Sequence, residues 1–376
     1  MYIPQKQLEN LKKRLVDNKV MVIYGPRRCG KTTLLKKFIE QVEGDYLFVT
    51  GEDITVQDSL SSQSIEKLKN FIGSNKLLII DEAQKIKNIG LNLKLIVDHI
   101  MGIKVISTGS SSFDLAQNIG EPLTGRKIVL RMFPLAQLEI KQLEDLHQTM
   151  ANLDSRLIYG SYPEIIINQD NQMRGQYLKE IVSSYLYKDI LELDGLRHSD
   201  KILRLLQLLA FQIGKEVSCN ELGTQLGMSK NTVDRYLDLL QQAFVLFRLS
   251  GFSRNLKKEV SKTSRYYFLD LGIRNALINN FNPLNLRDDA GMLWENYIIA
   301  ERIKKQEYQQ ILANNYFWRT YDQKEIDLIE EREGALFGYE IKLGKKEGRA
   351  PKDWLATYPQ AKYFVVNKEN YLEFIN

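Results

Sequence analysis

The chain has 376 residues, of which 44% are hydrophobic and 26% charged, and a formal net charge of +5. This length favours two or three domains, and the balanced composition excludes an extensively disordered protein. The polar N-terminus, the lack of any run of roughly 20 apolar residues and two well-separated cysteines argue against a signal peptide, a membrane span and a disulfide or zinc framework. We therefore expect a cytoplasmic protein without membrane contact.

Residues 1–133 alternate short apolar runs with amphipathic stretches. The apolar runs are strand candidates, at Val20 to Tyr24, Tyr46 to Thr50, Leu77 to Ile80, Lys104 to Ser107 and Ile128 to Leu130. Helix-compatible spacing lies between them, at Lys31 to Val42, Ser64 to Ile72 and Ile89 to Ile100. Strands that alternate with helices are typical of β-α-β crossovers, so the pattern predicts a parallel α/β sheet.

A phosphate-binding motif follows the first apolar run. The residues Gly25-Pro26-Arg27-Arg28-Cys29-Gly30-Lys31-Thr32 fit the pattern G-x-x-x-x-G-K-[ST] between a strand and a helix. The glycines let backbone N–H groups surround the phosphates, and the helix N-terminus adds its positive dipole end. We expect Lys31 to reach the β- and γ-phosphates and Thr32 to ligate Mg²⁺, with Thr33 also in the site. The expected cofactors are ATP and Mg²⁺.

Two carboxylates, Asp81 and Glu82, end the third apolar run. We expect Asp81 to hold Mg²⁺, directly or through water, and Glu82 to orient or deprotonate the attacking water. Alternatively, Glu82 only caps the following turn, and nucleotide then binds without fast turnover. The next strand leads to Thr108-Gly109-Ser110-Ser111-Ser112. Thr108 or Ser110 would lie beside the phosphates at the carboxyl edge of the sheet, although a hydroxyl-rich turn also explains these residues.

Arg126 is the candidate for a catalytic arginine. Such a residue stabilises the charge that develops in the transition state, from within the subunit or from a neighbouring one. Arg131, Arg27 and Arg28 compete for the same role.

The middle of the chain is mostly helical. Residues 134–196 are interrupted at Gly160-Ser161-Tyr162-Pro163 and are interpreted as a helical lid or linker. Residues 197–275 have helix-turn-helix spacing, with a basic segment at 254–262 between two strands, as in a winged variant. The elements expected there are helices at Lys201 to Ile213, Glu221 to Leu226 and Asn231 to Gln241, and strands at Phe244 to Leu249 and Arg265 to Leu269.

Basic residues are concentrated in this same region. Between Arg197 and Arg265 there are twelve Lys or Arg against six Asp or Glu, and this excess accounts for the surplus of the whole chain. A locally basic region predicts an anionic partner, duplex DNA first. Basic faces are also often merely solvated, and a winged helix can mediate protein contacts instead.

Residues 280–376 return to a mixed α/β pattern. The expected elements are a helix from about Gly291 to Lys305 and strands at Tyr316 to Thr320, Ile326 to Glu330, Phe337 to Leu343 and Tyr363 to Val366. Glu295 lies on the helix, and Asp327, Glu340 and Lys342 lie on the strands. Strand periodicity puts Glu340 and Lys342 on one face.

These four polar residues have the spacing of a metal-dependent nuclease. Asp327 and Glu340 could ligate one or two Mg²⁺ ions, Glu295 could complete the shell, and Lys342 could stabilise the attacking hydroxide or the pentavalent phosphate. Alternatively, the charged residues only reflect the alternation of a half-exposed strand. Against that alternative, Asp327 interrupts an otherwise apolar run, and a buried lone carboxylate is costly.

Taken together, these motifs resemble those of the bacterial and archaeal AAA-type P-loop ATPases that carry a C-terminal PD-(D/E)xK-like region. The resemblance spans nearly the whole chain and rests on the phosphate loop, Ile-Ile-Asp-Glu-Ala-Gln, Ser-Thr-Gly-Ser-Ser-Ser, Gly125-Arg126 and Gly160-Ser-Tyr-Pro163. Cys29 stands where the family often has Val, and Ile326 replaces the Pro of the nuclease signature.

The resemblance implies an α/β architecture of four parts. These are an AAA-type core at 1–133, a helical lid at 134–196, a winged helix at 197–275 and a restriction-endonuclease-like α/β domain at 280–376. It also allows a homo-oligomer formed through the AAA-type domain.

We expect an ATPase that acts on DNA, with a metal-dependent endonuclease as a further activity. The alternative is a nucleotide-dependent signalling switch whose nuclease-like domain is inactive and serves as a binding surface.

Overall fold

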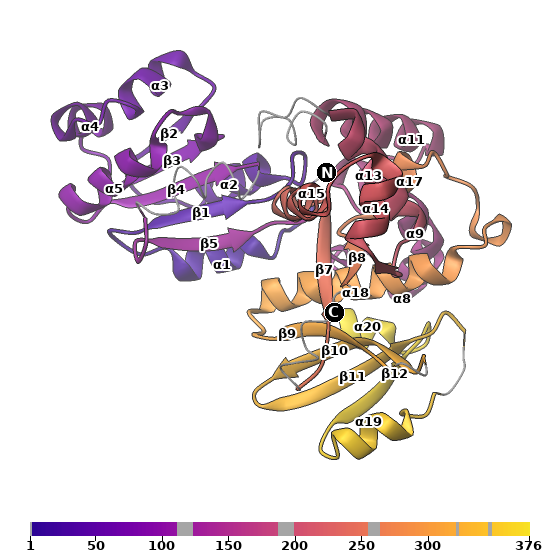
Figure 1. The fold of residues 1–376 in the computed structure, drawn as a ribbon. Helices are drawn as coiled ribbons and strands as arrows, with labels where there is room; N and C mark the ends of the chain where they lie inside the picture. The colour runs from indigo at the N-terminus through magenta and orange to yellow at the C-terminus, as the bar shows by residue number, and fades with distance from the viewer. Residues whose placement is uncertain (1, 111–122, 187–198, 255–263, 321–322, 345–347) are drawn as a thin grey trace.

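The computed structural model describes residues 2–110, 123–186, 199–254, 264–320, 323–344 and 348–376 (Figure 1). Ser111, Ser112 and all of the basic segment except Arg254 lie outside these residues. Among the helices of the described ranges, none is long and apolar enough to cross a membrane.

A five-stranded parallel sheet forms the N-terminal region, with the strand order β2-β3-β4-β1-β5. Its strands are β1 (Val20–Tyr24), β2 (Tyr46–Thr50), β3 (Leu77–Asp81), β4 (Lys104–Gly109) and β5 (Lys127–Arg131). Its helices are α1 (Gln7–Arg14), α2 (Lys31–Ile39), α3 (Ile54–Leu60), α4 (Ile65–Ile72), the 3-10 turn η1 (Ala83–Lys85) and α5 (Ile89–His99). The predicted parallel α/β sheet is confirmed, and α1 and α3 are additional to the prediction.

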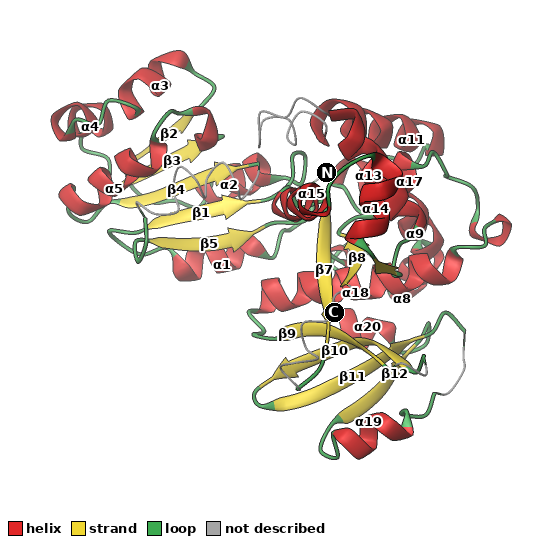
Figure 2. Cartoon of the chain, viewed as in Figure 1, coloured by secondary structure: helices red, strands yellow, loops and turns green. Residues whose placement is uncertain are grey.

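Helices cover both faces of this sheet (Figure 2). Met21 and Ile23 of β1 pack in one hydrophobic cluster with residues of α1 and α2, whereas Val20 and Val22 pack in another with residues of α3, α4 and α5. Burial on both faces explains why β1 and β3 are continuously apolar up to their carboxyl ends. Because the strands are parallel, their carboxyl ends meet at one edge, which brings the phosphate loop beside the ends of β3 and β4.

Residues 134–186 are mostly helical, as predicted. The segment consists of α7 (Gln137–Ile140), α8 (Leu146–Ala151), α9 (Leu153–Tyr159), α10 (Pro163–Ile167), α11 (Asn171–Glu180) and the π-helical turn η2 (Ile181–Leu186). The interruption at Gly160 has a packing reason. Gly160 has φ +72°, and a Cβ there would lie 2.2 Å from a carboxylate oxygen of Asp270. The same carboxylate accepts a hydrogen bond from the Ser161 backbone N–H at 2.7 Å.

The predicted helices and strands of the next region are also present. The elements are α13 (Ser199–Phe211), β6 (Glu216–Val217), α14 (Cys219–Leu226), α15 (Lys230–Gln242), β7 (Leu246–Gly251), β8 (Ser264–Phe268) and α17 (Leu271–Leu277), of which β6 and α17 are additional to the prediction. Ser229 caps α15 by accepting from the Thr232 backbone N–H at 3.1 Å, and the predicted inner face of α15 is buried at Val233, Leu237 and Leu240. Since the segment between β7 and β8 is largely outside the described residues, the wing itself stays a prediction.

The C-terminal part shares a sheet with this region. It contains the 3-10 turn η3 (Leu284–Leu286), α18 (Ala290–Gln309), β9 (Asn314–Arg319), β10 (Glu325–Arg332), β11 (Ala335–Ile341), α19 (Lys352–Thr357), β12 (Lys362–Val366) and α20 (Tyr371–Ile375). A seven-stranded sheet has the order β12-β11-β10-β9-β7-β8-β6. Its two halves join where β7 pairs in parallel with β9, with Ser250 opposite Tyr316 and Gly251 opposite Phe317.

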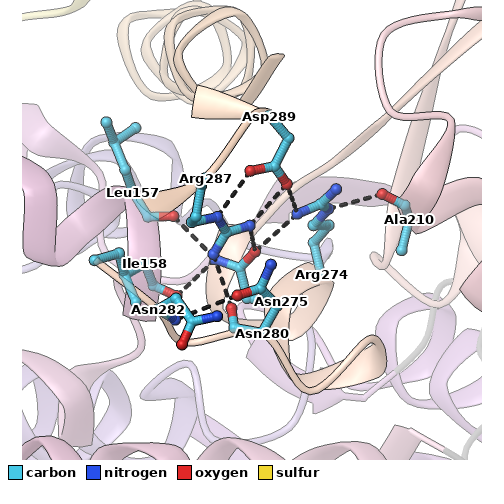
Figure 3. A network of polar contacts seen from close by, with 9 residues as sticks. All are labelled: Leu157, Ile158, Ala210, Arg274, Asn275, Asn280, Asn282, Arg287 and Asp289. Atoms are coloured by element: carbon cyan, nitrogen blue, oxygen red, sulfur yellow. Dashed lines mark hydrogen bonds and ion pairs between the residues drawn. The ribbon is translucent and has the colours of Figure 1, made fainter. Parts of the chain in front are cut away.

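A buried charge network holds the start of α18 (Figure 3). The Asp289 carboxylate accepts hydrogen bonds from Arg274 at 2.5 Å and from Arg287 at 2.7 and 2.8 Å. Asn275 donates to the backbone carbonyls of Leu157 and Ile158. Although burial opposes ionisation, the two guanidinium groups lower the pKa of Asp289 to about 2. The network therefore ties α9, α17 and α18 together.

The opposite end of α18 contacts the N-terminal part of the chain. The Tyr308 hydroxyl accepts from the Phe133 backbone N–H at 3.1 Å, and the Tyr308 carbonyl accepts from Asn10 at 2.9 Å. Seven residues before Tyr308 in the same helix, Glu301 accepts a hydrogen bond from the Gln137 backbone N–H at 2.6 Å. A single 20-residue helix thus reaches from the buried charge network to the N-terminal sheet.

Candidate nucleotide-binding site

The phosphate loop depends on its glycines. A Cβ on Gly25 would lie 2.5 Å from the Met132 carbonyl oxygen, and one on Gly30, which has φ +100°, would lie 2.5 Å from the side-chain amide of Gln5. Lys31 is buried, and its ammonium donates to the carbonyls of Gly25 at 2.8 Å and Pro26 at 2.9 Å. The loop therefore surrounds the Lys31 ammonium, at the position where phosphate oxygens are expected.

Asp81 is the centre of a short chain of hydroxyl contacts. The Thr32 hydroxyl donates to one carboxylate oxygen of Asp81 at 2.7 Å, and the Thr108 hydroxyl donates to the other. The Glu82 backbone N–H in turn donates to Thr108 at 3.0 Å. The structure therefore brings together the predicted residues Thr32, Asp81 and Thr108. A hydroxyl and a carboxylate at this spacing suit Mg²⁺, which takes few protein oxygens and completes its shell with water and phosphate.

Glu82 has a left-handed backbone, with φ 51° and ψ 43°. This conformation is uncommon for a non-glycine residue and is concentrated at functional sites. The Gln84 amide donates to the Glu82 carboxylate at 2.6 Å and to the Ser110 hydroxyl at 3.2 Å. The Gln84 amide oxygen is buried and, among the described residues, has no hydrogen-bond partner. Gln84 was not predicted as a site residue, because a glutamine after two acids carries no motif of its own.

Arg126 lies at the wrong edge of the sheet to act on the nucleotide of its own chain. It precedes β5, whose amino end is paired with the amino end of β1, so Arg126 is about 16 Å along the strand from the phosphate loop. Its guanidinium is paired with Asp98 at 2.6 Å. The prediction of a role within the subunit is therefore wrong. Arg131, at the carboxyl end of β5 and 3.4 Å from Glu307, lies at the correct edge.

The N-terminal segment supports the loop from behind. The Gln5 amide donates to the Cys29 carbonyl at 3.2 Å, and the Lys6 backbone N–H donates to Glu139 at 2.7 Å. Burial raises the pKa of Glu139 to about 7, although it also accepts from the Ala136 backbone N–H. Cys29 is fully buried, as expected for a small packing residue. No sequence pattern marks Gln5, since its role follows from a contact 24 residues away.

The four polar residues of the predicted nuclease site do converge. Asp327 is 4% exposed and accepts from the Ile341 backbone N–H at 2.7 Å. Glu295 accepts from the Tyr267 hydroxyl at 2.7 Å, and Lys342 forms an ion pair with Glu340. Burial is the main cause that raises the pKa of Asp327 well above its usual range, and the nearby Glu295 and Glu340 carboxylates raise it further.

An unpredicted arginine lies among these carboxylates. Arg265 of β8 is 5% exposed. Its guanidinium is 2.6 Å from Glu325, 3.8 Å from Asp327 and 3.9 Å from Glu295. Across the described ranges, no three His, Cys, Asp or Glu side chains are arranged to hold a metal ion. The described residues therefore do not arrange Glu295, Asp327 and Glu340 as the predicted metal shell.

Three protein-family models match consecutive parts of the chain. Residues 17–141 match the family described as AAA domain, and residues 150–284 and 290–375 match domains of unknown function, DUF8612 and DUF4143. The N-terminal region is accordingly an AAA-type P-loop ATPase domain.

The chain is also similar, over most of its length, to uncharacterised proteins and to a solved structure. An uncharacterised protein of Mycobacterium tuberculosis is 26% identical over 337 residues, which are 88% of this chain and 72% of that protein. An uncharacterised protein of Methanocaldococcus jannaschii is 25% identical over 356 residues, covering 89% of this chain and 78% of that protein. The Walker-type ATPase of Pyrococcus abyssi has a TM-score of 0.47 at 16% identity, over 73% of this chain and 94% of that one.

Proposed function

We propose that this protein is a Mg²⁺-dependent ATP phosphohydrolase whose nucleotide state controls the binding of duplex DNA by residues 197–275. The observation that carries the enzymatic part is the grouping of Lys31, Thr32, Asp81 and Thr108 at one edge of the sheet. Each has the chemistry that phosphoryl transfer from ATP requires.

Each side chain of the site has a separate task in this proposal. The Lys31 ammonium offsets the charge of the transferred phosphoryl group, and Thr32 and Asp81 hold Mg²⁺, which supplies further charge neutralisation. Glu82 orients the attacking water and accepts its proton. The catalytic arginine is either Arg131 of the same subunit or, in a homo-oligomer, Arg126 of a neighbouring copy.

A short packed path supports coupling between the nucleotide site and the helix-turn-helix region. The Met132 backbone N–H donates to the Tyr24 carbonyl at 2.6 Å, directly before the phosphate loop. The next residue, Phe133, packs edge-on against Phe244 with ring centroids 6.1 Å apart, and Phe244 immediately follows α15 and its cap residue. A shift of the loop on nucleotide binding would therefore reach α15 through two contacts.

The exposed part of α15 bears on the choice of partner. Lys230, Asn231 and Arg235 are exposed on it, a composition suited to phosphate and base contacts. Asp238 is exposed on the same helix and is unfavourable near phosphate. This carboxylate favours the second candidate, a nucleotide-dependent switch in which the region binds a protein instead.

The test is fluorescence anisotropy of a labelled duplex with the full chain, in ATP and in ADP, at several salt concentrations. We expect binding that differs between the two nucleotides, with each lost phosphate contact flattening the slope of log K against log salt by about 0.9. The double substitution of Lys230→Ala and Arg235→Ala removes two such contacts and should flatten the slope by roughly twice that amount. Lys69→Ala, on the exposed side of α4, is the matched control. Absence of duplex binding in either nucleotide would contradict the DNA proposal and favour the switch.

A further inference from the structure

Arg265 is held in place by its backbone and by its side chain. It lies on β8 with Glu216 of β6 opposite on one side and Leu249 of β7 opposite on the other. Its guanidinium carbon lies 4.7 Å from the centre of the Phe317 ring. A residue paired on both edges and stacked on an aromatic ring is a fixed part of the sheet.

The charge of this group is permanent. An arginine stays protonated in proteins, and a buried cation is tolerated only where anions compensate it. The compensating carboxylates are those of Glu295, Glu325 and Asp327, which come from α18 and β10. We call these four residues the Arg265 cluster.

The position of the guanidinium conflicts with a metal ion at the same place. Mg²⁺ requires its oxygen ligands at about 2.1 Å from one point. One terminal nitrogen of Arg265 is 3.8 Å from Asp327 and 3.9 Å from Glu295. It lies near both of the carboxylates that a shared ion would have to draw together, and adds a positive charge that repels a second cation.

Access from solvent does not explain the conflict. A cavity of about 450 Å³ is lined by Arg265, Glu295 and Glu325 of the cluster and by Lys215 and Arg319. A hydrated ion can therefore approach Glu295 and Glu325, where it meets the guanidinium of Arg265.

We propose that Arg265 is the built-in cation of this cluster and replaces the divalent metal that Glu295, Asp327 and Glu340 would otherwise share. The C-terminal region then lacks the metal ion that hydrolysis of phosphodiester bonds at these carboxylates would need. This inference is independent of the ATPase function, because the phosphate loop shares no residue with the cluster.

The experiment measures Mn²⁺ binding by the full chain without nucleotide, from the electron paramagnetic resonance signal of free Mn²⁺. Wild type and Glu295→Gln should bind equally, since the cluster takes no metal in either. Arg265→Met, which keeps an unbranched apolar side chain and removes the guanidinium and its charge, should gain one site at least tenfold tighter than any in wild type. Adding Asp327→Asn should abolish that site, and Arg265→Lys, which keeps the charge, should not create it.

Two results would overturn the proposal. One is Mn²⁺ binding by wild type that Glu295→Gln removes, because metal and arginine would then coexist. The other is a folded Arg265→Met protein, judged by an unchanged circular dichroism spectrum, that gains no site. If Arg265→Met does not fold, the comparison of wild type with Glu295→Gln still decides. As a second readout, plasmid nicking by wild type with Mn²⁺ that is lost in Asp327→Asn would also contradict the proposal.

Discussion

Replacing Glu82 by Gln tests whether this residue acts in the chemistry or only shapes the turn. Gln keeps the length of the side chain and removes the charge and the ability to accept a proton. The contacts to Gln84 can be kept after the change, because the Gln84 amide can rotate by half a turn and present its oxygen. Its oxygen, which has no partner among the described residues, would then accept from the new amide and from Ser110, so both contacts are retained.

The expected effect is therefore confined to turnover. Loss of a general base lowers kcat by about 10²- to 10⁴-fold, which corresponds to about 3–5 kcal/mol in the activation barrier. Phosphate release at saturating Mg²⁺ and ATP measures kcat, and titration with a fluorescent nucleotide measures affinity, which should change less than about threefold. Glu66→Gln, at an exposed carboxylate in the first turn of α4, is the matched control and should behave as wild type.

Two outcomes would refute the reasoning about Glu82. A kcat within threefold of wild type would mean that the carboxylate only caps the turn. A parallel fall in kcat, nucleotide affinity and melting temperature would mean that the substitution disturbs the site, and that the rotation of Gln84 does not compensate.

Four further predictions concern the site and its supports. Lys31→Ala should lower phosphate release by at least about 10²-fold, and unchanged release at saturating ATP would contradict the role given to this cation. Tyr308→Phe leaves the buried Phe133 N–H unpaired and should lower the unfolding free energy by about 1–3 kcal/mol, as measured by urea denaturation. Glu139 has its folded-state pKa raised from 4.5 to about 7, so its contribution to stability is present below pH 4.5 and should be lost as the pH rises through 7, by up to about 3 kcal/mol; an equal slope in Glu139→Gln would show another group to be responsible. Asp289 has its pKa lowered from 3.8 to about 2, so its contribution is present above pH 3.8 and should be lost as the pH falls toward 2, a dependence that melting curves of Asp289→Asn should lack.

The N-terminal sheet was predictable because its inner strands β1, β3 and β4 are buried on both faces. Such strands read as uninterrupted apolar runs, and β1 and β2 match the predicted residues without any shift. Thr32, Asp81 and Thr108 were predictable for a related reason. The carboxyl ends of parallel strands must meet at one edge, so their order along the chain fixes their proximity in space.

Residues whose roles come from contacts between distant elements were not predictable. Arg265 reads as an ordinary strand residue, and its meaning depends on carboxylates from β10 and α18 that reach it only in the folded sheet. Arg126 was a candidate for the catalytic arginine, a role that within one subunit requires the edge of the sheet where the phosphate loop lies. The pairing of β5 with β1 places it at the other edge instead.

The joining of β7 to β9 has a consequence for any attempt to study parts of the chain separately. The family models divide the chain near residues 284–290, yet this division leaves β7 on one fragment and β9 on the other. Each fragment would then present a newly uncovered strand edge, which is a template for pairing with other chains. Fragments cut there should aggregate or pair with each other again, whereas a fragment that begins before α13 and continues to the end of the chain keeps all seven strands together.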